Sequence, residues 1–153
     1  MARSASPPGG GTGSALPWRG EGASAEWLAG IDGYDLVLLD LPLGMAPVIP
    51  CRRLLVVNAD ANCHVRLHRH SWAADERLLV TQFSSQRALQ QGLLDLWLAG
   101  GLPLLNLHLH RDEAMAEAMA AKLPVGRYAP TNLVAHELAA LATWCLAEGE
   151  APR

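Results

Sequence analysis

An uninterrupted apolar run between two aspartates constrains most strongly how this chain can fold. The run Leu36-Val37-Leu38-Leu39 lies between Asp35 and Asp40, and a proline follows at position 42. Apolar runs of this length, without polar alternation, are typical of strands that are buried on both faces in a parallel sheet. We therefore predict a central strand over Tyr34–Asp40, which stops before Pro42 because proline cannot donate to a ladder.

Asp40 would then lie at the carboxyl edge of this strand, where open α/β folds bind their ligands. In nucleotide-binding enzymes an aspartate at such a place holds magnesium, usually through water. Aspartates also follow strands simply because they cap the next turn. The run itself leaves both interpretations of Asp40 open, a magnesium-associated carboxylate and a turn-capping one.

Strand and helix patterns alternate over the rest of the chain. Short apolar runs predict further strands at Arg53–Asn58, Leu78–Thr81 and Leu102–Leu107. Capping residues and terminal charges predict a short helix over Ala25–Ala29 and helices that begin at Asp60 or Asn62, at Ser84 or Ser85, at Asp112 and near Thr131. This alternation predicts an α/β domain with a mainly parallel sheet.

Apolar positions on three of these helices indicate which side chains should be buried. The expected buried residues are Leu89, Leu93, Leu96 and Trp97 in the helix that Gly100-Gly101 ends, and Val134, Leu138, Leu141 and Cys145 in the last helix. Between these helices, Met115 and Met119 lie one helical turn apart, and core packing is their simplest explanation.

The first 24 residues differ in composition from the rest. They are dominated by Gly, Pro, Ser and Ala and are predicted to be disordered, which leaves residues 25–150 as the folded domain. Gly9–Ser14 faintly resembles a phosphate-binding loop. It lacks a lysine and a preceding strand, and Pro17 interrupts the helix that should follow, so we assign it to the disordered segment.

Charge and cysteine usage exclude several classes of protein. The net charge is −3, with 12 Lys and Arg against 15 Asp and Glu, and no basic run offers nucleic acid a positive face. The 3 cysteines are widely spaced and odd in number, which indicates a reducing cytoplasm and not a disulfide framework. No apolar run approaches the roughly 18 residues of a membrane span. A cytoplasmic protein without a direct membrane span is therefore expected.

The histidines and Cys63 have side chains that can bind a metal ion. Cys63, His64, His68 and His70 lie close in sequence, and His108 and His110 fall on one face of the last strand and its end. A structural zinc site needs a closing pair of ligands at a set spacing, and none is present. We expect no metal site here, and we assign these residues to hydrogen bonds or to a partner surface.

The segments His110–Ala114 and Lys122–Tyr128 resemble the C-terminal signature of the MinD/ParA class of P-loop ATPases, which has the SIMIBI fold. Three further stretches, Val57–His68, Leu94–Leu98 and Thr143–Leu146, are similar to the BcsQ (YhjQ) family of bacterial cellulose-biosynthesis operons. The resemblance runs from about Trp27 to Leu146. The residues that carry the signature are Asn58, Asp60, Asn62, Cys63, His64, Arg111, Asp112, Pro124 and Tyr128.

This resemblance implies an accessory protein of the cytoplasmic cellulose-secretion machinery, recruited to the inner-membrane synthase complex. Members of the class bind ATP with magnesium, dimerise around it and engage small proteins encoded beside the synthase. The implied partners are therefore other cellulose-synthase operon proteins and a second copy of the chain. In this resemblance Asp40 matches the magnesium-associated aspartate.

The sequence also departs from the family pattern. Residues 1–24 stand where the family has a first strand and a glycine loop with a lysine, and Thr81-Gln82-Phe83 occupies a place where many relatives have asparagine. Without that loop there is no basis for ATP hydrolysis, so we assign no catalytic residue and no cofactor. The expected fold is a partial MinD/ParA-like domain whose P-loop part is absent.

Two other functions remain as alternatives. A full nucleotide-switch ATPase, with ATP and magnesium, would follow if an N-terminal part is missing from this sequence. A ParA-type partitioning protein is disfavoured by the acidic balance and by a last helix without a run of lysines or arginines. If the P-loop part is absent, residues 25–150 alone should be poorly soluble or marginally stable, because an apolar sheet edge would be open.

Overall fold

The computed structural model describes residues 25–42 and 44–149. Contacts divide the chain into two compact units, Met1–Pro50 and Cys51–Arg153. The first unit contains helix α1 (Ala25–Ala29), which confirms the predicted helix. The sequence offers Ser24 as the N-cap of this helix, and Ser24, the loop Gly9–Ser14 and the predicted disorder of residues 1–24 lie outside the described residues.

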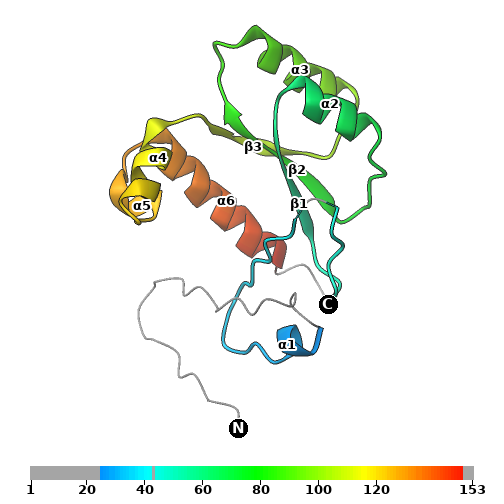
Figure 1. The fold of residues 1–153 in the computed structure, drawn as a ribbon, viewed down its shortest axis with the longest axis vertical. Coiled ribbons are helices and arrows are strands. Elements are labelled where there is room, and N and C mark those ends of the chain that lie inside the picture. The colour runs from blue at the N-terminus through cyan, green and yellow to red at the C-terminus, as the bar shows by residue number, and fades with distance from the viewer. Residues whose placement is uncertain (1–24, 43, 150–153) are drawn as a thin grey trace. The chain divides into compact units, whose positions relative to one another are not determined.

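The second unit contains a parallel sheet, which confirms the predicted α/β class (Figure 1). Within the described ranges this sheet has the order β1-β2-β3, with β1 at Arg53–Asn58, β2 at Glu76–Phe83 and β3 at Leu104–His110. β1 and β2 pair continuously, whereas the register between β2 and β3 shifts on both sides of Val80. All three carboxyl ends therefore meet at one edge of the sheet.

The predicted central strand over Tyr34–Asp40 is wrong. The structure gives this segment no strand, and most of its side chains are exposed, with Leu38 at 76%. A strand is held by hydrogen bonds to a neighbouring strand, and an apolar composition does not supply that neighbour. Asp40 is therefore an exposed residue that does not end a strand.

The predicted strand at Arg53–Asn58 is confirmed, and the other two have different limits. β2 extends beyond Leu78–Thr81 in both directions, from the buried Glu76 to Phe83. β3 lies further along the chain than Leu102–Leu107. The N–H of Leu102 donates to Trp97 O at 3.1 Å, so Leu102 closes the preceding helix.

Helices α2 (Ala61–His68) and α3 (Ala88–Ala99) connect the three strands. Parallel connections are right-handed, and two of them running in the same direction across a sheet place both helices on one face. Side chains from both helices pack there in one core cluster, Ala59, Leu67, Leu78, Val80, Phe83, Leu93 and Trp97. Asp60 and not Asn62 caps α2, since its Oδ1 accepts a hydrogen bond from the N–H of Cys63 at 2.8 Å.

Helix α3 begins later and is rotated relative to the prediction. Its first residue is Ala88 and not Ser84 or Ser85. Gln90, Leu93 and Trp97 are buried, whereas Leu89 and Leu96 are 62% and 52% exposed, so the predicted face is wrong for these two leucines. Because the large Trp97 ring is buried, the face of α3 that carries Trp97 is the one that packs against the core. Gln90 lies about two turns before Trp97 and shares its face.

Three helices follow β3: α4 (Glu113–Ala120), α5 (Val125–Tyr128) and α6 (Leu133–Gly149). Helix α6 packs against β3, on the side of the sheet away from α2 and α3 in Figure 1. The predicted stripe on α6 is confirmed, because Val134 is buried and Leu138, Leu141 and Cys145 are half-buried. No helix within the described ranges is both long enough and apolar enough to cross a membrane.

The predicted core role of the α4 methionines is wrong. Met115 is 37% and Met119 is 78% exposed, and the buried residues of this helix are Ala114 and Ala118. The two alanines pack in one cluster with Val125 of α5 and Val134 of α6, and the methionines stay outside that cluster. The predicted cap at Asp112 is confirmed, since its Oδ1 accepts from the N–H of Ala114 at 2.8 Å.

Candidate functional site

The carboxyl edge of the sheet collects several of the signature residues. Asn58 ends β1, and its Oδ1 accepts a hydrogen bond from Thr81 Oγ1 at 3.1 Å. Arg111 follows β3, and its backbone N–H donates to Phe83 O at 2.9 Å. Because Asp60 and Asp112 cap the helices that leave β1 and β3, both carboxylates are occupied by backbone N–H groups.

A buried amide holds the turn between β2 and α3 at the same edge. Gln90 is 8% exposed, and its Oε1 accepts from the N–H of Ser84 at 2.7 Å. Its Nε2 donates to the carbonyl of Gln82 at 3.5 Å, and Gln82 has a φ of 52°. A left-handed residue other than glycine persists only where its surroundings hold it. Sequence reasoning missed Gln90, although an amide in an apolar stripe is a recognisable signal.

Helix α6 is tied to the end of β3 by Glu137. Its Oε2 accepts from the backbone N–H of His110 at 2.8 Å, and its Oε1 is hydrogen-bonded to Nδ1 of the same histidine. The neighbouring His108 stacks edge-on against Phe83 at 4.6 Å. Burial, with the charge of His110, lowers the pKa of His108 below 6.5, so its neutral form is favoured at pH 7. Glu137 was also missed, and its signal is a single acid within the apolar part of the last helix.

The signature residues Cys63 and His64 belong to the packing between α2 and α3. The indole N–H of Trp97 donates to His64 Nδ1 at 3.0 Å, and the half-buried Cys63 packs against the core cluster. His68 contacts His64 ring to ring at 5.0 Å, while Asn62 is exposed. In the described part of the chain, no three His, Cys, Asp or Glu side chains gather as a metal would require.

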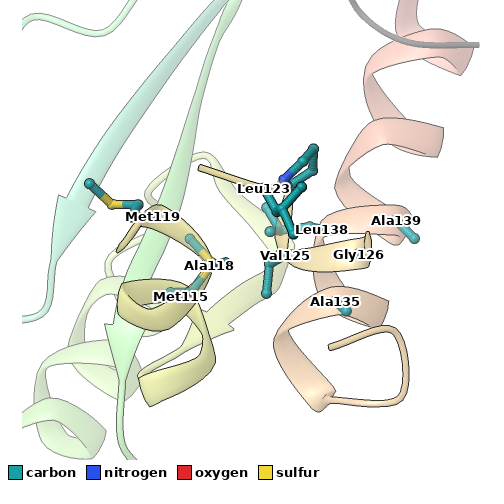
Figure 2. A pocket seen from close by; sticks show the side chains of 10 residues that line it. Met115, Ala118, Met119, Leu123, Val125, Gly126, Ala135, Leu138 and Ala139 are labelled. Carbon is teal, nitrogen blue, oxygen red and sulfur yellow. The ribbon is translucent and has the colours of Figure 1, made fainter. Parts of the chain in front are cut away.

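An apolar groove lies among α4, α5 and α6 (Figure 2). It has a volume of about 490 Å³, and we call it the α4–α6 groove. Its lining residues are Met115, Ala118, Met119, Leu123, Pro124, Val125, Gly126, Ala135, Leu138 and Ala139. The signature residue Pro124 is one of them and also precedes the first turn of α5.

The local chain chemistry at the end of α4 creates this groove. Lys122 has a φ of 54°, and the N–H of Leu123 donates to Ala118 O at 3.0 Å, which is a Schellman ending. This ending turns the chain so that Leu123 lines the groove. The signature residue Tyr128 ends α5, and the charge of Glu117, with a hydrogen bond to it, raises the pKa of the Tyr128 phenol.

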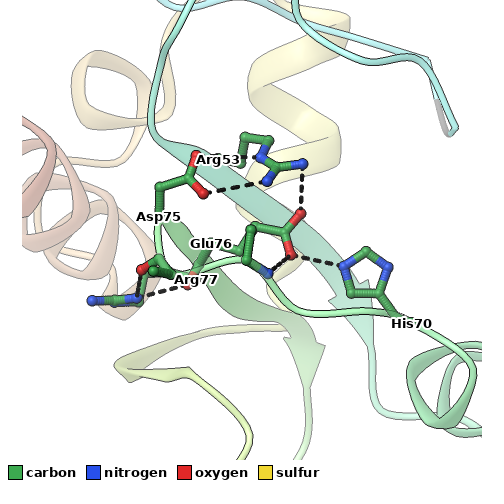
Figure 3. Close-up of polar contacts among 7 residues, drawn as sticks. Arg53, His70, Asp75, Glu76 and Arg77 are labelled. Carbon is green, nitrogen blue, oxygen red and sulfur yellow. Dashed lines mark hydrogen bonds and ion pairs between the residues drawn. The ribbon is translucent and has the colours of Figure 1, made fainter.

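A buried carboxylate organises the amino edge of the sheet (Figure 3). Glu76 is 2% exposed and accepts from His70 Nε2 at 2.9 Å and from the N–H of Ala73 at 3.0 Å. Arg53 Nη1 lies 3.0 Å from the other carboxylate oxygen. The network therefore joins the starts of β1 and β2 to the segment that follows α2. Sequence reasoning did not identify Glu76.

The parallel sheet with its connecting helices defines an α/β protein, which is consistent with a partial MinD/ParA-like domain. Residues 21–146 match the family model described as "Cellulose biosynthesis protein BcsQ", and the chain belongs to that family.

Proteins of this name from two bacteria are similar to the chain. It is 40% identical over 131 residues to "Cellulose biosynthesis protein BcsQ" of Salmonella typhimurium, which covers 82% of this chain and 52% of that relative. It is also 40% identical over 119 residues to "Putative cellulose biosynthesis protein BcsQ" of Escherichia coli K12, covering 74% of this chain and 49% of the relative. The chain thus spans about half the length of the curated relatives it matches.

Proposed function

We propose that this chain takes part in bacterial cellulose biosynthesis as an accessory protein that acts through protein–protein contacts. Its membership of the BcsQ family supports the process, and the α4–α6 groove supports the mode of action. The partners on this proposal are proteins encoded in the cellulose-synthase operon, with a second copy of the chain as an additional partner. They would recruit the protein from the cytoplasm to the inner-membrane synthase complex.

The α4–α6 groove is the single observation that carries this proposal. Apolar grooves of this kind accept the apolar face of a partner helix. Met115 and Met119 contribute flexible, polarisable side chains that adapt to a partner surface. Both methionines, together with Leu123 at 46%, are exposed in the chain by itself. A partner that covers them would remove this apolar area from water, which favours binding.

Met119→Asp should weaken binding of the partner by at least about tenfold, or about 1.4 kcal/mol, because it places a charge in the apolar contact. Each protein encoded beside the chain would be co-expressed with it, and the dissociation constant measured by calorimetry. Leu98→Asp is the matched control, since Leu98 is 58% exposed on α3. If both variants bind every operon protein as the parent does, the groove is not the contact surface.

We further propose that this sequence binds ATP–magnesium only weakly and does not turn it over. Backbone N–H groups of a glycine loop and a lysine normally hold the β- and γ-phosphates, and residues 25–149 contain no such lysine-bearing loop. The exposed position of Asp40, away from a strand end, supports the same view. The alternative of a nucleotide-switch ATPase belongs to a longer protein that includes the loop.

Titration with a fluorescent ATP analogue should therefore give no saturable binding in the micromolar range, and Asp40→Ala should change nothing. Asp35→Ala is the control for a general loss of negative charge. Micromolar binding that disappears in Asp40→Ala but persists in Asp35→Ala would overturn the proposal and restore the switch ATPase.

A further inference from the structure

The apolar lining of the α4–α6 groove continues along an exposed face of α6. Ala135, Leu138 and Ala139 line the groove (Figure 2), and Ala142 and Leu146 follow them at helical spacing on the same face. Ala142 is exposed, and Leu146 is 48% exposed. We call these five residues the α6 stripe. At 1.5 Å per residue the stripe is about 16 Å long, which matches about three turns of a second helix.

The composition of the α6 stripe favours a helix as its occupant. Three of its five residues are alanines, and small side chains let a neighbouring helix approach closely. The hydroxyl of Thr143, one residue beyond Ala142, donates to Ala139 O at 2.9 Å, so it is already satisfied within α6. A helix with apolar side chains at every third or fourth position fits such a surface.

Two exposed cations flank the groove in the sequence. Lys122 directly precedes the lining residue Leu123, and Arg127 directly follows the lining residue Gly126. Among the residues that the structure describes, neither the ammonium group of Lys122 nor the guanidinium group of Arg127 has a hydrogen-bond or ion-pair partner. Both charges are therefore available to a partner that enters the groove.

The carboxylates of α4 and α6 do not offset these two cations. Glu117 is hydrogen-bonded to Tyr128, and Glu137 is hydrogen-bonded to the end of β3. Glu113 lies in the first turn of α4, at the end of that helix far from Lys122. The groove is thus apolar within and has unpaired positive charge beside it. A partner that complements both features carries an apolar face with acidic residues next to it.

We propose that the occupant of the α4–α6 groove is an acidic amphipathic helix of a partner protein, about three turns long. Its apolar face lies on the α6 stripe, and its carboxylates lie beside Lys122 and Arg127. The apolar contact provides most of the affinity, whereas the charges select and orient the partner. This inference rests on the proposed function and adds to it the chemistry of the partner.

The test uses the whole chain and a fluorescein-labelled peptide of about 18 residues, which is long enough to form a helix by itself. The peptide carries leucines at i, i+3, i+4 and i+7 spacing and glutamates on the flanking positions. Saturable binding is expected in fluorescence anisotropy. The double variant Lys122→Glu/Arg127→Glu should weaken it at least about tenfold. A peptide with lysine in place of glutamate should bind the parent weakly and bind the double variant tightly.

Matched variants make the result specific to this surface. Ala142→Glu places a charge on the α6 stripe and should weaken peptide binding at least about tenfold. Ala140→Glu adds the same charge at an exposed position two residues away, on another face of α6, and should leave binding unchanged. Arg69→Glu reverses an exposed charge at the end of α2 and should also leave it unchanged. Equal losses in Ala142→Glu and Ala140→Glu would overturn the proposal.

Two other occupants would give different results. A dimer in gel filtration that Ala142→Glu converts to a monomer would overturn the proposal in favour of a second copy of the chain. Flotation with phosphatidylglycerol vesicles that is lost in Ala142→Glu would overturn it in favour of a membrane surface.

The calorimetric test of Met119→Asp separates this inference from the proposed function. If Met119→Asp weakens an operon protein but the acidic peptide does not bind, the inference is wrong and the proposed function stands. If Met119→Asp changes no operon protein's binding and the peptide does not bind, both are wrong.

Discussion

Trp97→Ala is expected to lower the free energy of unfolding by about 3–5 kcal/mol. The Trp97 side chain is 1% exposed and packs in the core cluster between α3 and the sheet. Alanine would leave a cavity there and also remove the donor to His64 Nδ1. Urea denaturation followed by circular dichroism measures the change.

Two neighbouring variants separate the causes. Leu96→Ala, at a position that is 52% exposed, should change the free energy of unfolding by less than about 1 kcal/mol. Trp97→Phe keeps most of the ring but leaves His64 without its donor, and should cost roughly 1–3 kcal/mol. Similar losses for Leu96→Ala and Trp97→Ala would show that α3 is not rotated as the structure has it.

Glu76→Ala should lower the free energy of unfolding by about 1–3 kcal/mol, because it removes a buried acceptor and leaves the N–H of Ala73 and the side chain of His70 without their hydrogen-bond partner. The Glu76 side chain is 2% exposed. Its carboxylate forms an ion pair with Arg53, and it is hydrogen-bonded to His70 and to the N–H of Ala73. Asp75→Ala is the matched control. Asp75 also pairs with Arg53, but its side chain is 47% exposed, and exposed pairs contribute little.

The same network predicts how stability depends on pH. Burial by itself would raise the pKa of Glu76, but the N–H of Ala73, the hydrogen bond from His70 and the charges of His70 and Arg53 outweigh it and hold the pKa below 4.5. A carboxyl whose pKa is lower in the folded state stabilises the fold fully above its unfolded pKa. This contribution is therefore lost as the pH falls below about 4.5.

Denaturation series at decreasing pH should show this loss in the parent chain, and it should be smaller in Glu76→Gln, which no longer titrates there. Asp75→Asn must be measured as well, because Arg53 also lowers the pKa of Asp75. Protonation of Asp75 therefore also reduces the stability of the fold as the pH falls. An unchanged acid slope in Glu76→Gln would contradict the assigned role of the buried carboxylate.

Local chemistry allowed several elements to be predicted from the sequence. Asp60 and Asp112 cap helices because a short acidic side chain reaches the N–H groups of the next turn, whatever lies elsewhere in the chain. Gly101, with a φ of 70°, ends α3 for an equally local reason. The β-branched and leucine residues of β1, and the signature segments that identify the family, were also visible in the sequence alone.

Tertiary structure decided which apolar and charged side chains are buried. Tyr34–Asp40 has the composition of a strand, but strand formation requires a neighbour that composition cannot supply. Met119 has the spacing of a core residue, but the alanines of α4 take the contact with α5 and α6. Glu76 and Glu137 look like surface acids in sequence. They are buried or half-buried because their partners, Arg53, His70 and His110, come from other elements and compensate the cost of removing a charge from water.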